Sequence, residues 1–179
     1  GAETIYRASD EAGLAHAVIE LCLEGTGYPR AAVVRITGEG LPPEIVAHRG
    51  PSSDPPGPFS FSHSLVHEAS AGHGVPLAQA EVPELGQSIS LLGIHSAVCT
   101  PLIVDGAAIG AIYLDAREAE PPSAPDAMSF CHAVGQLASL SLGSLKRAEL
   151  QTRQRKLDEE IKLARQAQSF LGSPEEGVI

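Results

Sequence analysis

The chain is poor in several residue types. Aromatic side chains make up 4% of its 179 residues and tryptophan is absent, so the core must be built from Ala, Leu, Ile and Val. No apolar run reaches membrane-spanning length, and no apolar secretory segment stands near the start. We therefore expect a cytoplasmic protein without membrane contact. Because the first residue is not Met, we also expect a piece of a longer protein.

Cysteine is scarce as well, and its spacing fits no common metal or disulfide pattern. Cys22, Cys99 and Cys131 fall in apolar segments, which predicts buried free thiols. His63 and His67 are four apart on a predicted helix, but no carboxylate or Cys partner is placed beside them. We therefore predict no metal site and no cofactor.

Basic residues are few in most of the chain. Residues 1–145 hold 5 basic and 16 acidic side chains, whereas residues 146–179 hold 7 basic and 6 acidic ones. The acidic body disfavours nucleic acid binding, because it repels phosphate backbones. The change in charge marks a boundary near residue 146. Together with the patterns described below, it leads us to expect a domain over residues 1–145, a coiled-coil signalling helix over residues 146–171, and the start of a linker to a further domain over residues 172–179.

Two apolar segments predict a buried β-hairpin. Residues 97–104 and 107–114 are almost wholly apolar, and Asp105-Gly106 between them favours a two-residue turn. Because both faces of each strand are apolar, we expect cover on both sides of the sheet. Asp115 at the end of the second strand is expected to cap a turn or to pair with a basic residue.

The same hairpin carries a family pattern. Residues 93–115 read GI-x-S-x-x-C-x-PL, a turn, and then G-x-x-x-G-x-x-YLD. This pattern resembles GAF domains, which are small sensory and dimerisation modules of signalling proteins; residues 59–80 and 138–145 are similar to further segments of the family. The resemblance implies an α+β fold, in which a central antiparallel sheet of five or six strands is flanked by helices and followed by a long C-terminal coiled-coil helix.

The GAF resemblance also implies a pocket for an unidentified small molecule between the sheet and a helix that begins near Ser62. The Asn-Lys-Phe-Asp-Glu signature of cyclic-nucleotide-binding relatives is absent. The expected lining combines polar residues of that helix with apolar residues of the sheet side: Ser62, Ser64, His67, Ile89, Leu92, Ile94, Cys99 and Tyr113.

The C-terminal part predicts one long helix, because no strong breaker intervenes between Asp126 and Gly172. Apolar residues recur there every seven positions, which predicts a parallel homodimeric coiled coil. A single, solvated helix is the alternative. The expected dimer interface is Leu150, Leu157, Ile161, Ala164 and Leu171.

The end of this helix carries a second pattern. Residues 157–171 read L-x-x-E-I-x-L-A-R-x-x-Q-x-x-L. The run resembles the helix that leads into stage II sporulation E-type serine/threonine phosphatase domains, although Gly172-Ser173 here precede Pro174. It implies a downstream effector in the same polypeptide, a metal-dependent phosphatase whose catalytic aspartates are not part of this chain.

Together these patterns predict a regulatory sensory and dimerisation module of a bacterial signal-transduction protein, without enzyme activity of its own. Two alternatives stay open. One is an enzyme of free-methionine sulfoxide reductase type, for which Cys99 is the candidate thiol. The other is a purely structural dimerisation domain with a filled pocket.

Overall fold

The computed structural model describes residues 2–38, 40–52, 54, 57–71, 91–117 and 126–172, together with the backbone of residues 75–78. Residues 1–143 and 144–179 form two compact units. Among the described residues, no helix is both long and apolar enough to cross a bilayer. The elements in chain order are α1 (Ala2–Tyr6), α2 (Glu11–Thr26), β1 (Arg30–Arg35), β2 (Glu44–Arg49), α3 (His63–Ser70), β3 (Val75–Ala78), β4 (Ser96–Val104), β5 (Ala107–Ala116) and α5 (Ala127–Leu171).

The strands form one antiparallel sheet in the order β2-β1-β5-β4-β3. The predicted α+β class and the long C-terminal helix are confirmed. The predicted hairpin is confirmed too, since β4 pairs with β5 from Ser96 opposite Ala116 to Val104 opposite Ala107. Its turn has φ of 53° at Asp105 and 78° at Gly106, two positive values in succession that suit Asp-Gly.

Side-chain caps begin two of the helices. The carboxylate of Asp10 accepts a hydrogen bond from the Gly13 N–H at 2.7 Å and starts α2. The hydroxyl of Ser62 accepts one from the Leu65 N–H at 3.4 Å and starts α3. Each cap satisfies a backbone donor that has no partner inside the helix.

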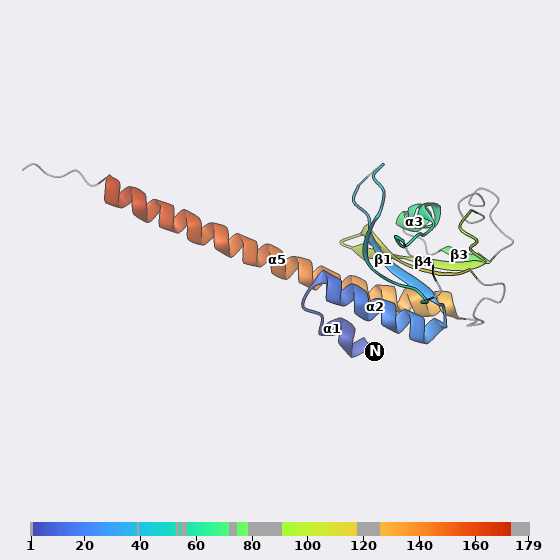
Figure 1. Ribbon diagram of the computed structural model, residues 1–179. Coiled ribbons are helices and arrows are strands. Elements are labelled where there is room, and N and C mark those ends of the chain that lie inside the picture. Colours follow the sequence, from blue (N-terminus) through green and yellow to red (C-terminus); the bar gives the residue numbers. More distant parts are fainter. Residues whose placement is uncertain are drawn as a thin grey trace, which may run out of the picture. The chain divides into compact units, whose positions relative to one another are not determined.

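Helices cover both faces of the sheet, as the apolar strands predict. In Figure 1, α3 lies on one side, whereas α2 and the first part of α5 lie on the other. On the α3 side, alternate residues of β1, β4 and β5 pack against buried residues of α3 and against residues that precede α3 and β4. This α3-side core consists of Ala32, Val34, Phe61, Leu65, Val66, Ala69, Ile94, Ala97, Cys99, Ala111 and Tyr113.

The first part of α5 is seated directly on β4 and α2. A Cβ added at Gly135 would lie 3.0 Å from the Thr100 methyl group, and the Ile103 N–H donates to the Ser139 hydroxyl at 2.9 Å. A Cβ added at Gly25 of α2 would meet the ring of Phe130 at 2.2 Å. Glycine at these two crossings lets the helix approach its neighbours closely.

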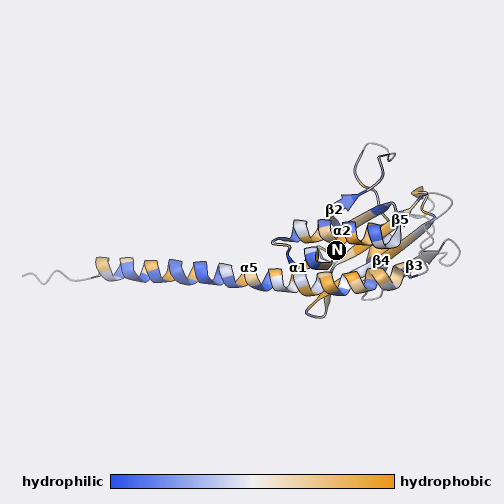
Figure 2. Cartoon of the chain, turned by 90° about the horizontal axis from the view of Figure 1, so that it is seen from below, coloured by the Kyte–Doolittle hydropathy of each residue, from blue (hydrophilic) through white to orange (hydrophobic). Residues whose placement is uncertain are grey.

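Beyond residue 143, α5 forms the second unit. Every described side chain from residue 146 onward is exposed. Apolar residues recur among the charged ones, as Figure 2 shows, and Leu157 and Ile161 are each 51% exposed. The coiled-coil dimer stays a prediction, and this row of apolar side chains is the surface it would use.

Candidate functional site

A chain of buried polar groups joins the start of α3 to the centre of the sheet. The Ser62 N–H donates to the Tyr113 hydroxyl at 3.3 Å, and that hydroxyl donates to Asp115 Oδ2 at 2.9 Å. Asp115 Oδ1 in turn accepts from Arg30 Nε at 2.7 Å. We call Ser62, Tyr113, Asp115 and Arg30 the buried polar chain. All four residues are buried, so each polar group depends on the next for its hydrogen bonds.

Register explains how Arg30 and Asp115 meet. They are 85 positions apart in sequence, but β1 pairs with β5 so that they lie directly opposite one another. The prediction that Asp115 pairs with a basic residue is confirmed; Arg117 is a second partner at 3.7 Å. Burial raises the pKa of Asp115, and the Arg30 charge is the largest of the effects that oppose this shift. Burial, followed by the Asp115 charge, raises the pKa of Tyr113.

A groove lies between α3 and the connection from β1 to β2. It has a volume of about 580 Å³ and is open to solvent, a size suited to a small molecule. One wall is α3, which contributes His63, Val66, His67 and Ser70. The other wall is the connection between β1 and β2, with Ile36, Gly38, Gly40, Leu41, Pro42 and Pro43. We call this hollow the α3 groove.

The chemistry of the α3 groove is mixed. Apolar walls at Ile36, Leu41 and Val66 suit an aliphatic or aromatic group. The imidazoles of His63 and His67 add hydrogen-bonding groups along one side. Among the described residues, no three His, Cys, Asp or Glu side chains are grouped as metal ligands.

The structure describes seven of the eight predicted pocket residues, and of these seven only His67 lines the groove. Ser62, Ile94, Cys99 and Tyr113 are buried. Leu92 packs against the α3-side core, Ser64 is partly buried, and Ile89 lies outside the described residues. His67 lines the α3 groove.

The space beneath α3 is occupied by the chain's own side chains. Phe61 meets Tyr113 edge-on with ring centroids 5.9 Å apart, and Leu65 and Cys99 are fully buried beside them. The groove wall formed by Ile36, Gly38 and residues 40–43 was not predicted from the sequence. Its Gly and Pro residues indicated a connection between strands, but nothing local shows that this connection faces α3.

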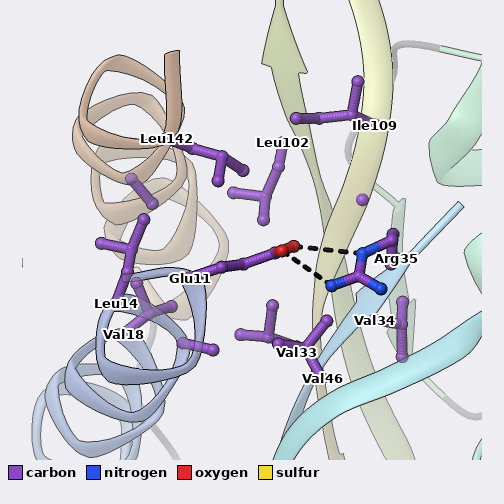
Figure 3. A pocket seen from close by; sticks show the side chains of 13 residues that line it. Glu11, Leu14, Val18, Val33, Val34, Arg35, Val46, Leu102, Ile109 and Leu142 are labelled. Atoms are coloured by element: carbon purple, nitrogen blue, oxygen red, sulfur yellow. Dashed lines mark hydrogen bonds and ion pairs between the residues drawn. The ribbon is translucent and has the colours of Figure 1, made fainter. Parts of the chain in front are cut away.

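On the face of the sheet that α2 covers, the structure shows a much smaller hollow. Figure 3 shows the hollow there, where Glu11 reaches from α2 to Arg35 through two hydrogen bonds of 3.2 and 2.7 Å among apolar side chains. Its volume is about 20 Å³, enough for about one water molecule and too small for an organic ligand.

The three thiols are divided between the two faces. Cys99 belongs to the α3-side core, whereas Cys22 and Cys131 come from α2 and α5. Cys22 and Cys131 share a hydrogen bond, which raises the pKa of Cys22 and lowers that of Cys131. Burial raises the pKa of Cys99 to about 12, with a smaller effect from Cys131. A thiol in this state is a poor nucleophile.

Comparison with known proteins identifies the family of the chain and proteins that share its fold. The model of the GAF domain family matches residues 10–142. The chromophore-binding domain of bacteriophytochrome RpBphP3 from R. palustris is 14% identical with a TM-score of 0.69, over 83% of this chain and 59% of that one. The cyanobacteriochrome TePixJ GAF domain is 14% identical with a TM-score of 0.61, over 79% of this chain and 94% of that one.

The chromophore-binding domain of a Stigmatella aurantiaca phytochrome is 19% identical with a TM-score of 0.60, over 77% of this chain and 56% of that one. No curated protein matches the chain. At these identities the likeness concerns the fold, and the chain spans little more than half of both phytochrome fragments. The family match covers about three quarters of the sequence, and the chain belongs to the GAF domain family.

Proposed function

We propose that the chain is a regulatory sensory module of a bacterial signal-transduction protein, which binds a small molecule in the α3 groove. GAF membership and the likeness to phytochrome and cyanobacteriochrome domains support a sensory role. The observation that carries the proposal is the α3 groove itself, with a helix as one of its two walls. A ligand there contacts α3 directly, so it can favour one position of that helix over another.

The contacts inside the first unit supply a route from the groove to α5. The start of α3 is held by the buried polar chain, which ends on β5 and β1. β5 pairs with β4 along its length, and β4 holds the first part of α5 through Ser139 and Gly135. A shift of α3 therefore changes contacts that are linked, step by step, to the base of the long helix.

The output proposed for α5 is a parallel homodimeric coiled coil through Leu150, Leu157, Ile161, Ala164 and Leu171. The exposure of these residues supports it, because water-exposed Leu and Ile gain stability when a second helix covers them. The downstream effector is proposed to be a metal-dependent serine/threonine phosphatase in the same polypeptide, supported by the pattern over residues 157–171.

One observation favours a second candidate. The α3-side core fills the space beneath α3, which suits a structural dimerisation domain that needs no ligand. The positions of the thiols do not support a methionine sulfoxide reductase. Cys99 lies on the α3 side of the sheet, whereas Cys22 and Cys131 belong to the helices on the other side.

Native mass spectrometry of the purified chain tests the sensory proposal and the dimer together. We expect a dimer that retains a small molecule or binds one from a metabolite library. Leu41→Asp, which places a charge in the groove wall, should abolish that binding. Leu140→Asp is the matched control, since Leu140 is a similarly exposed leucine outside the groove. A dimer that binds nothing would support the structural alternative.

A further inference from the structure

A second pocket lies where the N-terminal end of β1, the end of β2 and the residue after β5 come together. Its volume is about 180 Å³, and its lining includes Arg30, His48, Asp54, Phe59, Ser60 and Arg117. We call it the arginine pocket. It is lined by none of the residues of the α3 groove, and the inference drawn from it does not depend on the proposed sensory role.

Two guanidinium groups in one small pocket stand out in this domain. Residues 1–145 contain only 5 basic side chains against 16 acidic ones, and two of those five are Arg30 and Arg117. The Arg30 side chain is 4% exposed and that of Arg117 is 25% exposed. Because burying a guanidinium is costly unless its donors are paired, the pairing of these two side chains determines what the pocket can hold.

Arg30 has a partner for each of its nitrogens. Nε donates to Asp115 at 2.7 Å, one terminal nitrogen donates to the Ser60 carbonyl at 3.1 Å, and the other pairs with Asp54. The guanidinium also lies over the ring of Phe59, 4.4 Å from its centroid. The His48 ring lies tilted against the same ring, with the ring centroids 4.9 Å apart. Arg30 is therefore a fixed wall of the pocket.

Arg117 is only partly paired. One terminal nitrogen donates to the carbonyl and hydroxyl oxygens of Ser60 at 2.9 and 2.8 Å. Its Nε is buried and has no hydrogen-bond partner within the described part of the chain. A buried charged donor without an acceptor is costly, so an acceptor in the pocket would stabilise it.

Charge identifies the kind of acceptor. Asp115, which is fully buried, is shared between both arginines. The second negative charge comes from Asp54, which is 29% exposed. Asp54 pairs with the terminal nitrogen of Arg30 that does not contact Ser60, and we call this nitrogen the outer nitrogen of Arg30. With Asp54 in place, the charges of the two arginines and two aspartates cancel. If Asp54 turns to solvent, the pocket carries one positive charge, which a single carboxylate neutralises.

We propose that the arginine pocket binds a small monocarboxylate. Its carboxylate accepts from Arg117 Nε and competes with Asp54 for the outer nitrogen of Arg30. Phe59 and His48 flank its organic part. The pocket is smaller than those that hold drug-sized ligands, which limits the acid to a few carbon atoms. A phosphate dianion would leave an excess negative charge beside buried Asp115.

The experiment is a titration of the ¹⁵N-labelled chain with sodium propionate, in which NMR follows the side-chain Nε–H signals of the arginines. We expect the Arg117 signal to shift and saturate at millimolar propionate. The Arg35 signal should stay in place, because its Nε donates to Glu11 outside the pocket. Sodium chloride at equal ionic strength controls for screening.

Two variants make the outcome specific. Arg117→Gln should abolish the saturable shift, with circular dichroism to confirm that it folds. Asp54→Asn removes the competing charge and should tighten propionate binding about two- to fivefold, the equivalent of one exposed ion pair. The proposal is overturned if chloride reproduces the shift, if phosphate binds more tightly than propionate, or if no signal saturates in the parent and in Asp54→Asn.

Discussion

The hydroxyl of Tyr113 should stabilise the first unit strongly for its size. Tyr113→Phe removes one oxygen atom and leaves the ring in the α3-side core. The Ser62 N–H then loses its acceptor, and Asp115 Oδ2 loses its donor at 2.9 Å. All these groups are buried, so water does not replace the lost bonds at low cost.

The expected loss follows from the two hydrogen bonds. A bond to a charged carboxylate contributes about 2 kcal/mol, and the longer bond from the Ser62 N–H contributes about 1 kcal/mol. Together they predict that the free energy of unfolding falls by about 3 kcal/mol. For a domain of this size that corresponds to a decrease in Tm of about 6–12 °C.

Urea denaturation followed by circular dichroism measures this difference. Tyr6→Phe is the matched control, since Tyr6 is 61% exposed and its variant should stay within about 0.5 kcal/mol of the parent. Amide hydrogen exchange adds a local measurement, because protection of the Ser62 N–H should fall with the loss of its acceptor. A loss below about 1 kcal/mol for Tyr113→Phe would refute the stabilising role of the buried polar chain.

Three further predictions follow from other parts of the chain. Leu157→Arg places a charge in the expected dimer interface and should convert dimers to monomers in analytical ultracentrifugation; a monomeric parent would contradict the coiled coil. Cys99, with its pKa raised to about 12, should resist iodoacetamide at pH 8 until urea unfolds the chain, as mass spectrometry of the peptide that contains Cys99 would show. At that pH its thiolate fraction is about 1 in 10⁴, against about a quarter for an ordinary thiol, and rapid native labelling would contradict the assignment. Gly110→Ala should lower the free energy of unfolding by about 1–3 kcal/mol, because the new Cβ would lie 2.6 Å from the Val34 carbonyl oxygen; an unchanged urea midpoint would show that the strands separate easily.

The parts of the fold that the sequence predicts are those with local causes. The β4–β5 hairpin follows from two apolar segments around Asp105-Gly106, and the helix starts follow from Asp10 and Ser62. The long helix α5 follows from the lack of breakers before Gly172. Each of these depends on residues that are close together in the chain.

The candidate site depends on residues that are far apart, and there the sequence is less informative. A carboxylate at the end of an apolar strand, as at Asp115, predicts a polar or basic partner. Only the register of β1 against β5 identifies that partner as Arg30. His67 lines the α3 groove, but the opposite wall comes from the connection between β1 and β2, which is distant in sequence. The buried positions of Tyr113 and Cys99 result from packing with Phe61 and other side chains, which no short pattern encodes.

The buried polar chain gives the two pockets a common structural element. Arg30 lines the arginine pocket at one end, and Ser62 starts α3, the wall of the groove, at the other. A ligand that draws Asp54 away from Arg30 alters the charge balance on Asp115, and therefore the strength of the hydrogen bond that Asp115 accepts from Tyr113. Any coupling between the pockets must be reciprocal. A ligand in the α3 groove would therefore change the affinity of the arginine pocket for propionate by the same factor as propionate changes the affinity of the α3 groove for that ligand. Tyr113→Phe interrupts the chain at its centre and should bring that factor close to one.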